Sequence, residues 1–173
     1  MDSRVMDGWW IDVMWMTQVS YHPVHTLILY HSLFHLLQPL TMTLPFLSVA
    51  IYHPRYGNFQ HWALHLHSSS EDLLFEVDGE HPTFQKVVSH AIPSESPTFI
   101  KSVFVGHIGH PDIPTVKDVV NATAVDNETL EWDCQDYVLE ILEGCEREAV
   151  LDDEDADYVE AREILRSIRG PML

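Results

Sequence analysis

The stretch Trp132-Asp133-Cys134-Gln135-Asp136-Tyr137-Val138 places a cysteine in the expected first turns of an amphipathic helix. Far upstream, Phe59-Gln60-His61-Trp62-Ala63-Leu64 places a histidine at the start of a strand-like run. The helix dipole and the free N–H groups at a helix N-terminus stabilise a thiolate. A nearby imidazole would complete an activated nucleophile. The two stretches together predict a cysteine-nucleophile enzyme whose histidine comes first in the chain.

Helical patterns surround this cysteine. Its own helix is expected from about residue 129 or 132 to 147, because apolar residues recur there on one face. Helices are also expected over about 114–122, where Pro114 suits the first helical position, and over about 155–169. The buried stripe of the cysteine helix is expected to contain Cys134, Tyr137, Val138, Ile141, Leu142 and Cys145.

Short strands are expected before these helices, at 47–52, 60–67, 73–77 and 99–105, where the chain is rich in apolar and β-branched residues. A turn joins the second and third runs, which predicts a hairpin. The second run alternates between an apolar face and an imidazole-bearing face, with Trp62, Leu64 and Leu66 on one and His61, Ala63, His65 and His67 on the other. This order predicts an α+β fold in which a small antiparallel sheet packs on the cysteine helix.

Length and charge limit the number of domains and the class of partner. The chain has 173 residues, of which 46% are hydrophobic, and this suits one domain with a real core. A net charge of −18 with only nine scattered Lys and Arg argues against nucleic-acid binding. Residues 146–163 hold nine Asp and Glu, and we interpret this run as a solvated, solubilising surface.

The two cysteines are expected to be free. Cys134 and Cys145 lie eleven residues apart on one expected helix, which separates them by about 16 Å along its axis. A disulfide requires Cα atoms within about 7 Å of each other. Because free thiols fit a reducing compartment, the expected localisation is cytoplasmic.

The first part of the chain differs from the rest. An apolar run over residues 24–51 is interrupted by histidines and by Pro39 and Pro45, which argues against a stable membrane span. The acidic start and the late apolar run argue against a secretory signal. We interpret residues 1–41 as a poorly ordered or mis-assigned extension, with Met42 as the true start. Residues 42–173 are then a single domain with an acidic C-terminal helix.

The two quoted stretches resemble the paired motifs of the circularly permuted papain-like superfamily, which includes NlpC-type hydrolases and relatives of lecithin:retinol acyltransferase. Asp133-Cys134-Gln135-Asp136-Tyr137-Val138 is similar to the nucleophile helix, and His61-Trp62-Ala63-Leu64 is similar to the histidine strand. The chain is also similar to small uncharacterised fungal proteins that carry this pair. The resemblance covers about residues 46–147 and implies a papain-like arrangement in permuted order.

The resemblance implies a role for each residue. Cys134 would be the nucleophile, and His61 would be the general base that later protonates the leaving group. A third polar residue would orient the imidazole. In the family it comes from the strand after the histidine, so Glu76 and Asp78 are the candidates. The chain departs here from the lecithin:retinol acyltransferase pattern, which uses a second histidine, and His81 just beyond the strand is a further option.

These roles predict a hydrolase or acyltransferase that forms an acyl-enzyme on Cys134 from an amide, ester or thioester. The substrate would be a small molecule, a lipid or a peptide, and no cofactor is expected. Water or another nucleophile would collect the acyl group, and the sequence does not choose between them. The alternative is a catalytically inactive papain-like fold that binds a partner through its cleft or its acidic C-terminal helix.

Each candidate residue also has a structural interpretation. Cysteines in amphipathic helices commonly fill the core, which is our interpretation of Cys145 and the alternative for Cys134. Trp62 and Trp132 are core anchors or walls of a cleft. A zinc site is a rival use of five histidines, but the chain has no His-Glu-x-x-His or Cys-x-x-Cys motif, so no metal is expected. The five are His61, His65, His67, His107 and His110.

Overall fold

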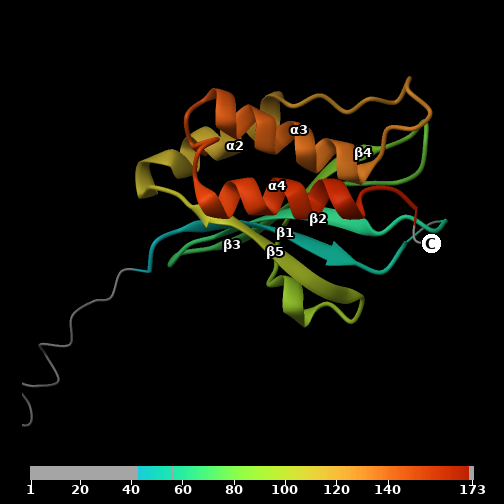
Figure 1. Cartoon of the computed structure of the whole chain (residues 1–173). Coiled ribbons are helices and arrows are strands. Elements are labelled where there is room, and N and C mark those ends of the chain that lie inside the picture. The colour runs from blue at the N-terminus through green and yellow to red at the C-terminus, as the bar shows by residue number, and fades with distance from the viewer. Residues whose placement is uncertain (1–42, 56, 172–173) are drawn as a thin grey trace, which may run out of the picture. The chain divides into compact units, whose positions relative to one another are not determined.

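The structure, a computed structural model, describes residues 43–55 and 57–171 and has a mixed α+β architecture. In this part of the chain, five strands form one antiparallel sheet in the order β4-β3-β2-β1-β5. The strands are β1 (Phe46–Tyr52), β2 (His61–His67), β3 (Asp72–Asp78), β4 (Gln85–His90) and β5 (Phe99–His107). The helices are α2 (Ile113–Ala122), α3 (Cys134–Arg147) and α4 (Ala156–Ile168), with short 3₁₀ turns η1 (Pro93–Glu95) and η2 (His110–Asp112). Figure 1 shows the three α-helices gathered over one face of the sheet.

Strand β1 is expected from the apolar run 47–52, and the structure confirms it. The strand pairs with β2 along one edge and with β5 along the other. Leu47, Val49 and Ile51 are fully buried in the core that faces the helices. Ala50 and Tyr52 belong to a smaller apolar cluster on the opposite face. A strand buried on both faces reads as a continuous apolar run, as this one does.

The expected hairpin of β2 and β3 is present, but its two strands pair over only part of their length. The register joins Leu64–His67 to Asp72–Phe75. Residues 61–63 and 76–78 do not pair with each other, whereas β3 pairs with β4 on its other side along residues 73–78. The two strands therefore separate at the end where β2 begins.

Two features of the sheet differ from the sequence-based expectation. Strand β4 was not expected, because it lies at the sheet edge with no buried residue and carries little apolar signal. Strand β5 continues through Gly106 and His107, which were expected to form a loop. Pairing of His107 with Phe46 and of Gly106 with Leu47 extends the strand.

The helices follow the expected pattern, with one corrected boundary. Helix α2 has a proline in its first turn, and α4 ends just before Arg169. Helix α3 begins at Cys134 and not at 129 or 132, because Asp133 is the residue that caps it. Asp126 instead accepts hydrogen bonds from the backbone of Glu128 and Thr129 in a separate turn.

The core lies between the sheet and the helices. All six residues of the expected stripe on α3 are buried there, and both cysteines are free. Trp62 and Trp132 are core residues as well. On α4, Tyr158, Ala161 and Leu165 are buried, whereas Ile168 is half-buried. Gln135, fully buried beside Cys134, was not expected in the core.

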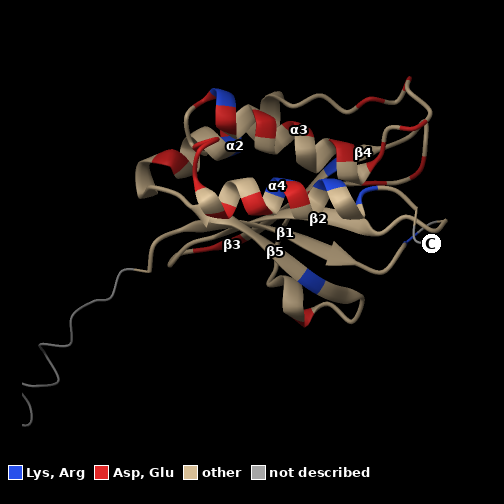
Figure 2. Ribbon diagram, viewed as in Figure 1, with Lys and Arg blue, Asp and Glu red and all other residues tan. Residues whose placement is uncertain are grey.

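The acidic run is solvated, as expected from its composition. Residues 152–157 are exposed, and Figure 2 shows acidic side chains along the helices and their connecting loops, while β1 carries no charge. Over the described residues, none of the helices combines the length and the apolar character that crossing a membrane requires. The interpretation of residues 1–41 as an extension and of Met42 as the start lies outside the described residues.

Close packing of α2 against α3 gives a stability prediction at Gly144. A Cβ atom added there would lie 2.5 Å from Cγ1 of Val119, a distance that requires the helices to shift. Overpacking of this kind costs about 1–3 kcal/mol, against a gain of up to about 1 kcal/mol in helix propensity. We expect Gly144→Ala to lower the free energy of unfolding, measured by urea denaturation.

The matched control is Glu143→Ala, the exposed neighbour on the same helix. Its free energy of unfolding should stay within about 0.5 kcal/mol of wild type. A Gly144→Ala protein as stable as wild type would show that the two helices have room to separate.

Candidate active site

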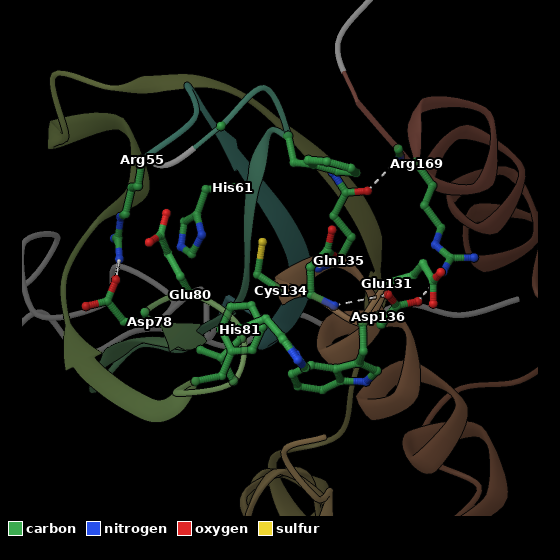
Figure 3. A pocket seen from close by; sticks show the side chains of 18 of the residues that line it. Arg55, His61, Asp78, Glu80, His81, Glu131, Cys134, Gln135, Asp136 and Arg169 are labelled. Carbon is green, nitrogen blue, oxygen red and sulfur yellow. Dashed lines mark hydrogen bonds and ion pairs between the residues drawn. The ribbon is translucent and has the colours of Figure 1, made fainter. Parts of the chain in front are cut away.

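The candidate site lies where β2 and β3 separate and the N-terminus of α3 meets them. A cavity of about 740 Å³ opens here. Its walls include Arg55 in the loop after β1, His61 at the start of β2, Asp78 at the end of β3, and Cys134 at the start of α3. Figure 3 shows the His61 imidazole and the Cys134 thiol among the side chains that line this cavity. The tertiary structure therefore brings together the two residues on which the sequence analysis depends.

The Cys134 thiol packs against the backbone that flanks His61. Its sulfur donates a hydrogen bond to the carbonyl oxygen of Gln60 at 3.9 Å. The backbone N–H of Trp62 approaches the same sulfur and favours its ionised form. Because Gln60 and Trp62 are the chain neighbours of His61, the thiol is held close to the first residue of β2. No hydrogen bond joins the thiol to the imidazole among the described residues.

The thiol is not activated in this state, in contrast to the expectation from its position at a helix N-terminus. Burial raises the pKa of Cys134 to about 12, since only 8% of the residue is exposed. The nearby Asp133 carboxylate adds to the rise, while the N–H of Trp62 and the charge of Arg55 oppose it. Two of the N–H groups at this terminus, those of Asp133 and Gln135, are engaged by the capping box that Asp133 and Asp136 form, so they do not add to the stabilisation of a thiolate.

The magnitudes of the two effects explain why burial, and not the helix N-terminus, determines the direction in which the pKa of Cys134 moves. A tenfold change in an acid dissociation constant corresponds to about 1.4 kcal/mol, so a pKa near 12 reflects several kcal/mol against the thiolate. A helix N-terminus contributes about 0.3–1 kcal/mol at ordinary sites. The contribution of the terminus is too small to compensate for removing the sulfur from water.

His61 has a buried carboxylate partner. Its Nε2 atom is hydrogen-bonded to Oε2 of Glu76, and both residues are buried. Arg55 donates to the same carboxylate oxygen at 3.0 Å. Nδ1 of His61 has no hydrogen-bond partner among the described residues, so it is the ring nitrogen left for chemistry in the cavity.

The Glu76 carboxylate is held in its ionised form. Burial by itself would raise its pKa, but hydrogen bonds and charges from His61 and Arg55 outweigh burial, and the pKa is lowered. Of the sequence candidates for the orienting residue, Glu76 is therefore the one in contact with the imidazole. Asp78 instead pairs with Arg55 at 2.9 Å, as Figure 3 shows, and is half-exposed. His81 lines the cavity, but among the described residues the side-chain partner of the His61 ring is Glu76 and not His81.

Gln135 joins three segments around the thiol. Its side-chain amide donates to the carbonyl of Gln60 at 3.0 Å, and its side-chain oxygen accepts from the backbone N–H of Gly170 at 2.8 Å. Pro171 forms an isolated β-bridge with Phe59, and Arg169 is paired with Asp136. The segment after α4 is thereby fastened over the start of β2, next to Cys134.

Sequence reasoning missed Arg55 and Gln135. Arg55 lies in a loop rich in Pro, Gly and Asn, and a single cationic residue in such a loop forms no sequence motif that would indicate a role. Gln135 was part of the quoted motif, but a polar residue beside a candidate nucleophile gave no sign that it would be fully buried. The five histidines of the rival zinc hypothesis do not meet, because His61 pairs with Glu76 and only His65 and His67 approach one another in a ligand-like group.

Comparisons with known proteins add no relative from which a role could be transferred. No protein-family model, no curated protein and no solved structure matches this chain. Arguments about function therefore depend on the geometry of these residues.

The raised thiol pKa predicts how Cys134 reacts with iodoacetamide. Because the thiolate is the reactive form, alkylation of Cys134 in the folded protein should be slow at neutral pH. Its midpoint should lie above the free-thiol value of about 8.5. Labelling is followed across pH, with the two cysteine peptides resolved by mass spectrometry.

Cys145, which is fully buried in the core, is the internal reference and should label more slowly still. A Cys134 midpoint well below 8.5 would contradict the dominance of burial and would restore the expectation of a preformed thiolate.

The contacts of Gln135 predict that the segment after α4 shields the thiol. Gln135→Ala removes both hydrogen bonds and should increase the rate of Cys134 alkylation severalfold, while the rate at Cys145 stays unchanged. The comparison is made at a fixed alkaline pH. Equal acceleration at both cysteines would indicate general loss of stability, and an unchanged rate at Cys134 would show that the segment does not shield it.

Proposed function

We propose that the protein is a thiol hydrolase or acyltransferase with Cys134 as nucleophile, His61 as base and Glu76 as the residue that orients the imidazole. The observation that carries this proposal is the buried His61–Glu76 pair in the wall of the cavity that Cys134 also lines. A permuted papain-like arrangement belongs to the proposal, supported by a histidine strand that precedes a cysteine helix.

The reaction begins from a neutral thiol. Because burial raises the pKa of Cys134 to about 12, the thiol is protonated at pH 7. His61 therefore takes the thiol proton through Nδ1 as the sulfur attacks the carbonyl carbon of the acyl group. The imidazolium, oriented by Glu76, then returns this proton to the leaving amine, alcohol or thiol. The product is a thioester on Cys134.

The second half of the reaction frees the enzyme. Water or another nucleophile loses a proton to His61 as it attacks the thioester carbonyl, and the Cys134 sulfur leaves and recovers that proton. The oxyanion formed in each half would be held by the backbone N–H groups of Cys134 and Trp62, both of which approach the sulfur. Hydrolase and transferase differ only in the second nucleophile.

The cavity wall favours a substrate with an apolar portion. Phe59, Phe84, Leu130 and Trp132 line it, and Leu130 is 73% exposed at its rim. The acidic side chains in the wall outnumber the arginines, and Arg55 and Arg169 are already paired with carboxylates. A neutral or cationic small molecule, lipid or peptide therefore fits better than a phosphate-bearing one.

A specific observation favours a second candidate function. The thiol is buried, donates to a backbone carbonyl and has a raised pKa, as expected of a structural cysteine. The alternative is a papain-like shell without catalysis, in which the cavity binds a partner molecule. In that case His61 and Glu76 would serve as a buried ion pair that holds the ends of β2 and β3 together.

Substitution of the two carboxylates near Arg55 tests the enzymatic proposal. Glu76→Gln removes the charged partner of His61, whereas Asp78→Asn removes a partner of Arg55 alone. We expect Glu76→Gln to lower turnover of p-nitrophenyl acetate at least tenfold and Asp78→Asn to leave it within about twofold. Release of nitrophenolate is measured, with Cys134→Ser and His61→Ala as inactive references.

Acetylation of Cys134, followed by intact mass spectrometry, identifies the acyl-enzyme directly. Turnover that persists in Cys134→Ser, or that falls equally in Glu76→Gln and Asp78→Asn, would reject the proposed roles and favour the binding function.

A further inference from the structure

Two rows of side chains cross the sheet on the face opposite the helices. In one row, the register sets His67 of β2 between Asp72 of β3 and Phe46 of β1. In the next row, His65 lies opposite Ser48 of β1. Residues two apart on a strand point to the same side, so both imidazoles project from the face that the helical core leaves uncovered.

Both imidazoles converge on a single carboxylate oxygen. Nε2 of His65 lies 2.8 Å from Oδ1 of Asp72, and Nδ1 of His67 lies 2.8 Å from the same atom. One ligand-type atom from each of the three residues lies within 4.8 Å of the other two. His65 is buried, while His67 and Asp72 are partly exposed. The group is therefore anchored in the sheet on one side and open to solvent on the other.

We propose that His65, His67 and Asp72 form a binding site for a divalent transition metal ion, with Zn²⁺ as the ion to test first. Two imidazoles and one carboxylate are a ligand set that zinc accepts, with a fourth position left for water. Zinc–ligand bonds of about 2.0–2.1 Å place tetrahedral ligand atoms roughly 3.3 Å apart. The 2.8 Å contacts need to open by only about half an ångström, which small side-chain rotations supply.

The residues around the three ligands support this assignment. Oγ of Ser48 lies 3.3 Å from Nδ1 of His65, where it can accept the N–H of that nitrogen. The lone pair of Nε2 is then directed at the metal, as an outer hydrogen bond does for metal-binding histidines. The Phe46 ring lies 4.7 Å from the His67 ring at 32°, which restricts rotation of that imidazole.

The site is independent of the proposed catalytic residues. His61 lies on the same strand but four residues earlier, about 13 Å along it, and its Nε2 atom is occupied by Glu76. The metal proposal therefore does not depend on acyl transfer, and loss of the metal should leave Cys134 chemistry unchanged.

Zinc binding by the full chain tests the proposal. Protein freed of metal by a chelator is titrated with ZnCl₂ by calorimetry, in wild type and in the His67→Ala and Asp72→Asn variants. We expect wild type to bind one more equivalent than either variant, or to bind that equivalent at least tenfold more tightly. Because the chain has 12 histidines, some outside the described residues, the difference between proteins is the informative quantity.

His107→Ala is the matched control, since it is exposed on the same face and lies across Phe46 from the three ligands. It should bind zinc as wild type does. Asp72→Asn keeps the size of the side chain, so it remains informative if His67→Ala fails to fold. Co²⁺ provides a second readout, a visible absorption of a four-coordinate site that Asp72→Asn abolishes. Equal zinc binding by wild type and both variants would overturn the proposal, as would equal loss in His107→Ala.

Discussion

The contact between the first residues of β2 and the N-terminus of α3 is the constraint on which the site depends. The carbonyl oxygen of Gln60 accepts hydrogen bonds from both the Gln135 amide and the Cys134 thiol. These two hydrogen bonds to one carbonyl oxygen hold the first turn of α3 against the start of β2. It also places the sulfur beside His61, because Gln60 directly precedes that residue. The cavity exists because β2 and β3 stop pairing at this point.

The same contact creates a conflict between position and burial. A cysteine at the start of a helix is well placed for a nucleophile, yet close packing removes its sulfur from water and makes ionisation costly. The carboxylates that cap α3 occupy N–H groups that would otherwise face the thiolate. A resting neutral thiol beside an oriented imidazole suits a mechanism in which the proton leaves during attack. This arrangement fits a preformed pair of Cys134 thiolate and His61 imidazolium less well.

The strict alternation of β2 distributes its histidines over one face of the sheet. His61, His65 and His67 all project away from the helical core, but their neighbours differ because the pairing of β2 with β3 changes along the strand. Where the strands separate, His61 reaches diagonally to Glu76. Where they pair in register, His67 lies opposite Asp72, and His65 reaches the same carboxylate. One strand thus supports two different groups of ionisable residues.

The sequence by itself determined the α+β class, four of the five strands, the helices and the buried stripe of α3, because these follow from local periodicity and capping residues. It also singled out His61 and Cys134, and it left Glu76 and Asp78 as the candidates for the orienting residue, with His81 as a further option. Only the tertiary structure decided among them, since register and strand separation determine which carboxylate reaches the imidazole. The sequence likewise did not predict the edge strand β4, the burial of Gln135 or the high pKa of the Cys134 thiol. Each depends on which surfaces distant segments cover in the folded chain. A local sequence pattern does not show which residues those segments shield from solvent.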